Sequence, residues 1–159
     1  MSLNEELGLR VPIATVGHEA LLNVYFSAVC IRKQAAEFLR PYRLTDVQIN
    51  VLMLLGHQAG QGEGLAQGQL SDMMLVNKAN VTGLVDRLER AGLVARTAHS
   101  KDRRSNVVQL TRRGRRLLEK VEPPYGREVA RIMAALRPAE QKTLIRLLER
   151  VRANISTAQ

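Results

Sequence analysis

Apolar residues recur at helical spacing along most of the chain. The first long helix is predicted over about residues 18–40. Pro41 ends it, because a proline disfavours helical geometry in the residue before it. Residues 1–17 show little pattern and contain Pro12, so we expect a flexible N-terminal arm there.

A second and a third helix are predicted after Pro41. Thr45 and Gln48 have the spacing of a capping box, in which each side chain bonds the other residue's backbone N–H. The helix that they open is expected to run to about Leu55 and to stop at Gly56. A shorter helix follows over about residues 66–74, with inward positions at Leu70, Met73 and Met74.

The fourth helix, predicted over residues 78–91, has the clearest apolar stripe of the chain. Its members recur at i, i+3, i+4 and i+7, and they are Val81, Leu84, Val85 and Leu88. Gly92 then suits the C′ position that closes a helix. Residues 93–98 and 106–110 are two short runs rich in Val and Leu, which predict a β-hairpin with a charged tip.

Helical patterning returns after the hairpin, starting at Thr111. Pro123 and Pro124 are expected to break or kink this helix. The pattern resumes over residues 129–136, and Pro138 suits the first position of a last helix. The predicted fold is therefore mostly α with a small β-hairpin.

The basic charge of the chain is concentrated in one segment. The 159 residues include 24 Lys or Arg and 15 Asp or Glu, giving a net charge of +9. Eleven of those basic residues, but only three of the acidic ones, lie within residues 78–116. Such a segment indicates a surface for phosphates, the alternative being a solvated face. It contains no Phe, Tyr or Trp on which single-stranded bases would stack, so a duplex is favoured.

Several function classes are not expected. Cys30 is the only cysteine, which excludes an intrachain disulfide and a cysteine-rich zinc site. The three histidines share no metal-ligand spacing, and no cofactor is expected. No nucleophile motif, metal cluster or dinucleotide fingerprint indicates an enzyme. No apolar run approaches the roughly 20 residues of a membrane helix, so we expect a cytoplasmic chain without membrane contact.

Residues 44–114 fit a winged helix-turn-helix, in which an α-helix enters the major groove of DNA. The fourth helix buries its apolar stripe, so its opposite face is available to the duplex. We expect base or near-base contacts from Lys78, Asn80 and Thr82, near the N-terminal end. Arg87 and Arg90 are expected to contact phosphates, the alternative being a solvated helix surface on which they pair with Asp86 or Glu89.

The charged tip of the hairpin is the second candidate contact. Arginine is attracted to narrow, A·T-rich minor grooves. Arg103 and Arg104 are the candidates for that role, with Lys101 and His99 beside them, and Asp102 is expected to orient an arginine by a charge-assisted pair. The alternative is a loop that is only soluble.

The terminal helices, within residues 18–43 and 115–159, are predicted to dimerise. Each is apolar on one side and flanks a module that is complete without it. A two-fold dimer would bury both stripes and place two recognition helices about one DNA turn apart. A monomer whose terminal helices pack on its own core is the alternative.

The order and spacing of several short motifs point to a known family. They are LTDVQ at 44–48, NKANVTGLVDRLE at 77–89, AGLV at 91–94, DRRS at 102–105 and LTRRG at 110–114. Together they resemble the MarR family of bacterial transcriptional regulators, and with the flanking helices the likeness covers about residues 18–155. The resemblance assigns Asp102 and Arg104 the family's wing roles.

The resemblance also implies a homodimer with interlocking terminal helices, bound to a pseudo-palindromic operator and usually acting as a repressor. It implies release from DNA when a small, often aromatic or phenolic ligand binds between the dimer helices and the winged lobe. The candidates for lining such a site are Tyr25, Phe26, Phe38, Tyr42 and Met53.

Two other functions stay open beside a ligand-released repressor. One is a redox switch on the same scaffold with Cys30 as the sensor, although the apolar neighbours of Cys30 favour a small buried residue. The other is a basic protein-interaction module without sequence-specific DNA binding.

Overall fold

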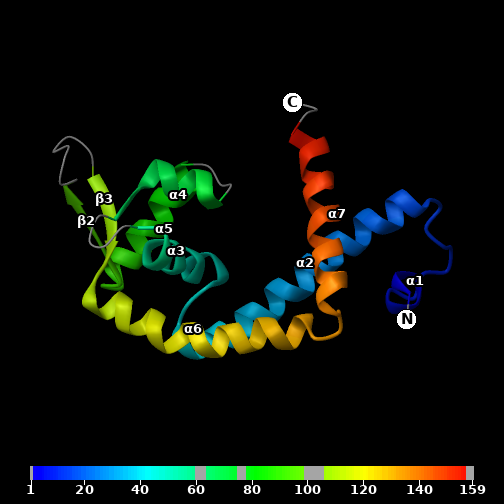
Figure 1. Cartoon of the computed structure of the whole chain (residues 1–159), viewed down its shortest axis with the longest axis horizontal. Helices are drawn as coiled ribbons and strands as arrows, with labels where there is room; N and C mark the ends of the chain where they lie inside the picture. The colour runs from blue at the N-terminus through cyan, green and yellow to red at the C-terminus, as the bar shows by residue number, and fades with distance from the viewer. Residues whose placement is uncertain (1, 60–63, 75–77, 99–105, 157–159) are drawn as a thin grey trace. The chain divides into compact units, whose positions relative to one another are not determined.

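The structure is a computed structural model that describes residues 2–59, 64–74, 78–98 and 106–156, with the backbone only at 78, 106 and 156 (Figure 1). It divides into two units, Met1–Leu118 and Glu119–Gln159. The elements are α1 (Leu3–Glu6), α2 (Val16–Leu39), the 3-10 helix η1 (Arg40–Tyr42), α3 (Asp46–His57), β1 (Leu65–Ala66), α4 (Gln67–Met74), α5 (Lys78–Arg90), β2 (Val94–Ala98), β3 (Asn106–Leu110), α6 (Arg112–Met133) and α7 (Pro138–Ser156). The prediction of a mostly helical chain with a small β-hairpin is confirmed.

The N-terminal segment has more local structure than an arm suggests. It contains α1, a single turn closed by reciprocal capping between Ser2 and Glu5, with Leu3 only 6% exposed. The Thr15 hydroxyl accepts from the His18 N–H, so α2 begins at Val16 rather than near residue 18. A four-residue turn is too short to show a helical period, which is why the pattern missed it.

The α3 helix begins as predicted and ends later. The capping box is present, with Gln48 N–H donating to Thr45 Oγ1 at 3.3 Å and Thr45 N–H donating to Gln48 Oε1 at 2.9 Å. The helix continues through Gly56 to His57, so the predicted stop at Gly56 is wrong. A methyl group at Gly56 would lie 2.6 Å from Leu118 Cδ2, so the Leu118 side chain would have to shift to admit one.

The core of the first unit lies between α3, α4, α5 and the sheet. The predicted stripe of α5 is at most 4% exposed, and Leu52 and Leu70 are fully buried. The prediction that Met73 faces inward is wrong, since it is 46% exposed near the end of α4. Burial of the stripe fixes which face of α5 is turned outward.

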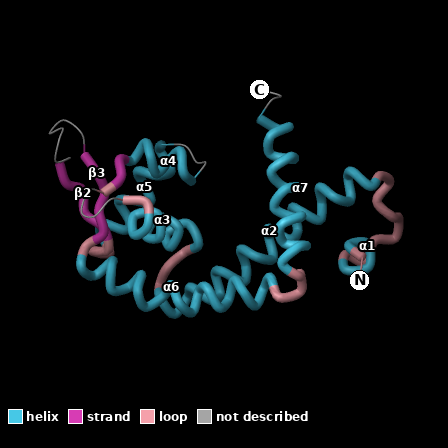
Figure 2. The backbone as a smooth tube through the Cα atoms, in the orientation of Figure 1, coloured by secondary structure: helices cyan, strands magenta, loops and turns pink. Residues whose placement is uncertain are grey.

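The predicted hairpin is present, and one strand adds to it. β2 and β3 pair antiparallel, from Val94 opposite Leu110 to Ala98 opposite Asn106. β1 pairs with the other edge of β3, giving the order β1-β3-β2, shown in magenta in Figure 2. A two-residue strand has no readable alternation, so the sequence did not reveal β1.

The proline pair does not end a helix. α6 runs from Arg112 through Pro123 and Pro124 to Met133, so of the predicted break or kink, the break does not occur. Proline fixes φ near the helical value and removes a donor, which costs hydrogen bonds without forcing the chain out of the helix. α7 begins at Pro138 as predicted.

Candidate nucleic-acid interface

The outer face of α5 carries the side chains predicted to meet DNA. Asn80, Thr82, Arg87 and Arg90 are all exposed, while the apolar stripe of the same helix is buried. The Lys78 backbone lies in the first turn of α5, and its side chain falls outside the described atoms. The helix therefore presents polar and basic groups along one accessible side.

The two arginines of α5 do not pair with its acidic residues. Arg90 Nε donates to the Asp86 backbone oxygen at 3.3 Å, and within the described residues neither Arg87 nor Arg90 forms an ion pair. The carboxylates of Asp86 and Glu89 are instead held by Arg96 of β2. The alternative in which those acids neutralise Arg87 and Arg90 is wrong.

The hairpin of β2 and β3 is the wing, and Arg96 of β2 connects it to α5 through several contacts. Its Nη2 lies 2.5 Å from Asp86 Oδ1, and its Nη1 contacts Glu89 Oε2. The Arg96 backbone N–H donates to Glu89 Oε1 at 3.0 Å. The hydrogen bond that Arg96 donates to Asp86, followed by the contacts with Glu89, raises the pKa of Arg96 and outweighs the opposing effect of burial.

The junction of α5 with the wing is closed by backbone geometry. Gly92 has a φ of 69°, its N–H donates to the Glu89 oxygen, and the Leu93 N–H donates to the Leu88 oxygen. This pair of bonds is a Schellman motif, the C-cap predicted for Gly92. Thr111 Oγ1 then donates to the Gly92 oxygen at 2.7 Å and accepts from the Gly114 N–H at 3.0 Å, tying the start of α6 to the same turn.

The tip of the wing lies outside the described residues. That segment contains the predicted contacts His99, Lys101, Arg103 and Arg104 and the predicted orienting residue Asp102. The strands that bring the chain to and from the tip are in place. Their pairing extends to Ala98 opposite Asn106, the last described positions on either side.

A second group of arginines had no role assigned from sequence. Arg112, Arg113, Arg115 and Arg116 are exposed in the first turns of α6, next to the turn that ends α5. These arginines contribute to the basic charge of residues 78–116, which the sequence analysis noted. A charge count does not show which element carries each side chain. They add four positive charges to the start of α6.

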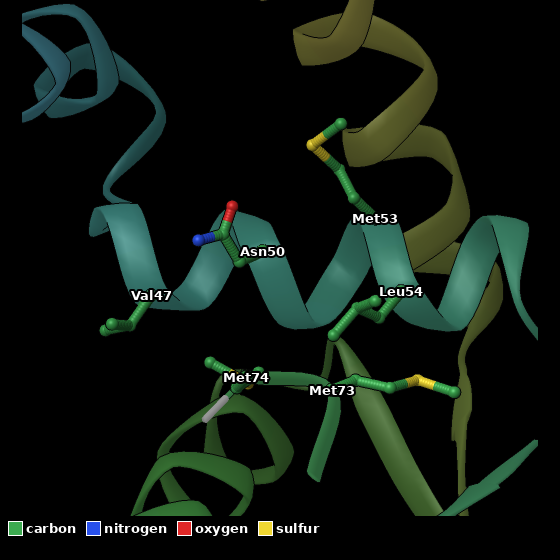
Figure 3. Close-up of a pocket in the computed structure, with 6 residues that line it drawn as sticks. All are labelled: Val47, Asn50, Met53, Leu54, Met73 and Met74. Atoms are coloured by element: carbon green, nitrogen blue, oxygen red, sulfur yellow. The ribbon is translucent and has the colours of Figure 1, made fainter. Parts of the chain in front are cut away.

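A cavity of about 390 Å³ lies between α3 and α4 (Figure 3). The residues that line it are Val47, Asn50, Met53, Leu54, Met73 and Met74. Figure 3 shows Val47 and Leu54 on the side of α3 that faces Met73 and Met74. Among these described lining residues none carries a formal charge, and Asn50 is the one amide.

Among the five predicted ligand-site residues, Met53 lines this cavity and the aromatic ones form two ring pairs elsewhere. Tyr25 and Phe26 on α2 are edge-to-face with centroids 6.2 Å apart. Phe38 and Tyr42, from α2 and η1, have centroids 5.8 Å apart. Tyr25 is 67% exposed.

Cys30 is exposed on α2, so the expectation of a buried cysteine is wrong for the chain by itself. The described residues hold no group of three or more His, Cys, Asp or Glu side chains placed to bind a metal ion. In the described part of the chain, no helix combines the length and apolarity needed to cross a bilayer.

Two packed helices, a β-wing and a basic outer face on the second helix define a winged helix-turn-helix protein of the DNA-binding class. The comparisons with known proteins name the family. A model of the MarR family matches residues 44–105. The HTH-type transcriptional repressor Mb2911 of Mycobacterium bovis is 30% identical over 80% of this chain and 89% of its own length. The chain belongs to the MarR family of transcriptional regulators, which is not a family of enzymes.

Other relatives match more locally or in fold alone. The chain is 38% identical to the HTH-type transcriptional regulator YkoM of Bacillus subtilis over 52% of its length, and it spans about half of YkoM (53%). CouR from Rhodococcus jostii, solved with p-coumaroyl-CoA, has a TM-score of 0.77 at 24% identity, covering 87% of this chain and 95% of CouR. MepR of S. aureus, solved with DNA, has a TM-score of 0.73 at 20% identity, covering 83% of this chain and 93% of MepR.

Proposed function

We propose that this protein is a homodimeric repressor that binds a specific pseudo-palindromic operator in duplex DNA and leaves it when a small ligand binds. The observation that carries the proposal is the outer face of α5. Arg87 and Arg90 are exposed there and form no ion pairs among the described residues, while Arg96 holds Asp86 and Glu89. A helix that is amphipathic in this way presents net positive charge to the phosphates beside a groove.

The contacts divide by their position on α5 and the wing. Lys78, Asn80 and Thr82 lie in the first turns, where recognition helices of this class meet base edges, and we assign them to base or near-base contact. Arg87 and Arg90 lie further along the helix and take phosphates. His99, Lys101, Arg103 and Arg104 take the flanking backbone or minor groove, with Asp102 orienting an arginine.

The dimer is supported by apolar side chains that the single chain leaves exposed on its terminal helices. On α2 these include Leu21 at 60%, Val24 at 44% and Val29 at 49% exposure. On α7 they include Leu147 and Val151, both at 47%, and Ile155 at 60%. Exposed apolar stripes of this kind mark protein–protein contacts, and we assign residues 18–43 and 115–159 to dimerisation around the winged domain at 44–114.

The repressor and ligand parts of the proposal draw on the relatives and the cavity. Mb2911 is named as a repressor, and CouR was solved with an aromatic thioester. The cavity between α3 and α4 offers flexible methionine side chains and one amide, a lining suited to an apolar or aromatic ligand.

Selection of bound duplexes from a random pool tests the proposal. We expect an enriched sequence with two inverted half-sites whose centres are about 10–10.5 base pairs, or a multiple of that, apart. Affinity for it should fall by about 10³-fold or more between 50 and 200 mM salt if six or more phosphates are contacted. A pool that shows no enrichment would support the protein-interaction module instead.

Release assays on the selected duplex distinguish a repressor released by a ligand from one released by oxidation. A series of phenolic compounds is titrated into the complex, and release that Met53→Trp abolishes supports the cavity as the effector site. Exposed Cys30 is the observation that favours a redox sensor. If peroxide releases the wild-type protein but not Cys30→Ser, the redox version holds; if both respond alike, it fails.

A further inference from the structure

We infer that Arg96 is a positioning residue that fixes the wing strand β2 against the recognition helix α5, and that operator selectivity depends on this brace. The inference rests on the proposed function, because it concerns how the DNA-reading elements are held. Sequence reasoning counted Arg96 among the basic residues without giving it a role of its own.

The first argument is the geometry of the guanidinium. Its Nη2 is 2.5 Å from Asp86 Oδ1, and its Nη1 contacts Glu89 Oε2. With the Gln67 amide turned so that its oxygen faces Arg96, that oxygen accepts from Nε at 3.2 Å and from Nη2 at 2.9 Å. All three guanidinium nitrogens are then engaged by side chains of α4 and α5, while the backbone of Arg96 belongs to β2.

The second argument is the position of Arg96 in the wing. It occupies the middle of β2, opposite Val108 of β3, so holding Arg96 holds both strands of the hairpin. The Arg96 N–H also donates to Glu89 Oε1 at 3.0 Å. The same carboxylate therefore holds the backbone and the side chain of one strand residue, which restricts how the hairpin can tilt on α5.

The third argument is burial. The Arg96 side chain is 27% exposed, against 46% for Asp86 and 39% for Glu89. A partly buried pair is screened less by salt than pairs on the open surface. Arginine suits this place because its planar fork makes several directed contacts at once, whereas the ammonium of lysine is a single point charge.

Fixing the wing against α5 should affect the preference for the operator more than the general affinity for any duplex. Phosphate contacts set affinity for any duplex, whereas base-edge contacts need the helix and the wing in one register. A wing that is no longer fixed keeps its positive charge, but its position relative to α5 becomes variable. Arg96 should therefore matter for the ratio of operator binding to binding of an unrelated duplex.

The experiment uses the full-length double variant Glu89→Gln with Arg96→Met. It removes one negative and one positive charge, so the net charge stays at the wild-type value and general attraction is preserved. Affinities are measured on the duplex selected by the wild type and on a random-sequence duplex, over a series of salt concentrations. Arg87→Met is the matched control, because it removes a proposed phosphate contact and leaves the brace intact.

We expect the double variant to bind the random duplex within about twofold of wild type and to lose about tenfold of its operator preference, the size of one mismatched base pair. Arg87→Met should weaken both duplexes alike and reduce the slope of log affinity against log salt by about 0.9. Arg96→Lys should lose part of the preference while keeping its charge. Equal loss on both duplexes, which a merely structural role predicts, would overturn the inference.

Two further outcomes are decisive. If Arg96→Met alone lowers the salt slope by about 0.9 with an unchanged preference, Arg96 is itself a phosphate contact and the brace is refuted. If the double variant does not fold by circular dichroism, Arg96→Lys decides, and an unchanged preference in that variant overturns the inference. A wild type that prefers no duplex would refute the proposed function itself, which is a separate result.

Discussion

In the proposed function, single side chains on α5 have two different roles: some contact bases and others contact the DNA backbone. Asn80 is exposed near the start of the helix, and Arg90 is exposed at its end. An amide forms paired hydrogen bonds with a base edge, whereas an arginine away from the groove floor meets phosphates that are the same in every sequence.

From this division we expect different effects of two alanine substitutions. Asn80→Ala should cost about 1–3 kcal/mol on the selected duplex and little on a random one. Arg90→Ala should weaken both duplexes and lower the salt slope by about 0.9. Titrations on the two duplexes at several salt concentrations measure both effects, and equal losses on all sequences for both variants would contradict the assignment.

Glu140 gives a prediction for pH at the same scale. Its carboxylate accepts from Arg137 Nη2 at 2.9 Å and from the Arg137 N–H at 2.8 Å, next to the first turn of α7. The Arg137 side-chain hydrogen bond, followed by the backbone one, lowers the pKa of Glu140. A lowered pKa stabilises the folded chain above the usual glutamate pKa, and that contribution is lost as pH falls through the lowered value.

The titration of Glu140 can be followed by carboxyl carbon NMR. We expect a midpoint below that of an ordinary glutamate, together with weaker protection of the first amides of α7 at low pH. Glu140→Gln should remove the pH dependence of that protection. A midpoint at the ordinary glutamate value would contradict the lowered pKa.

Between elements, the start of α6 packs closely against the turn that follows α5 and leads into β2. A methyl group at Gly114 would lie 2.0 Å from the Leu93 backbone oxygen. That oxygen also accepts from the Thr111 N–H at 3.0 Å, so it has little freedom to move. The glycine in the LTRRG motif is therefore explained by a helix that packs against backbone.

Gly114→Ala should destabilise the fold by about 1–3 kcal/mol, a typical cost of overpacking, because a backbone atom must shift. Gly126→Ala in the same helix is the control, since a methyl group there has nothing within 4 Å. In that position alanine should stabilise by up to about 1 kcal/mol through helix propensity. Urea unfolding of both variants measures the difference, and equal shifts of the midpoint would refute the packing explanation.

At the scale of the whole molecule, the exposed stripe of α7 predicts association. Leu147→Gln with Val151→Gln should weaken the dimer, because burying such a side chain stabilises by roughly 1.5–3 kcal/mol. Because a two-fold dimer contains each substitution in both protomers, every substitution removes two apolar side chains from the interface. Lys142→Gln, at an exposed polar position of the same helix, should leave the dimer intact.

Sedimentation measures this prediction. We expect the wild type at twice the 17.7 kDa chain mass and the double variant shifted toward a single chain with concentration. A wild type that sediments as one chain at all concentrations would contradict the dimer and favour terminal helices that serve the monomer.

Much of the fold was readable from local spacing. The capping box at Thr45, the stripe of α5 and the C′ glycine at Gly92 each depend on residues within a few positions of one another, and all were predicted. The pattern failed where an element was too short, as in α1 and β1, or where a helix continued through a glycine, as α3 does at Gly56. Pro123 and Pro124 led to a wrong expectation of a helix break. Each proline lacks a backbone N–H donor, but the helix continues without those hydrogen bonds.

The sequence by itself determined most of the helices, the hairpin and the concentration of positive charge, because the apolar period and the charge count are properties of neighbouring residues. Only the tertiary structure decided which charges stay available for DNA. Asp86 and Glu89 lie beside Arg87 and Arg90 in the chain, yet they bind Arg96, which the hairpin brings across from β2. A guanidinium pairs with a carboxylate that the fold brings within a few ångströms. The distance between Arg96 and the carboxylates of Asp86 and Glu89 cannot be obtained from their spacing in the sequence.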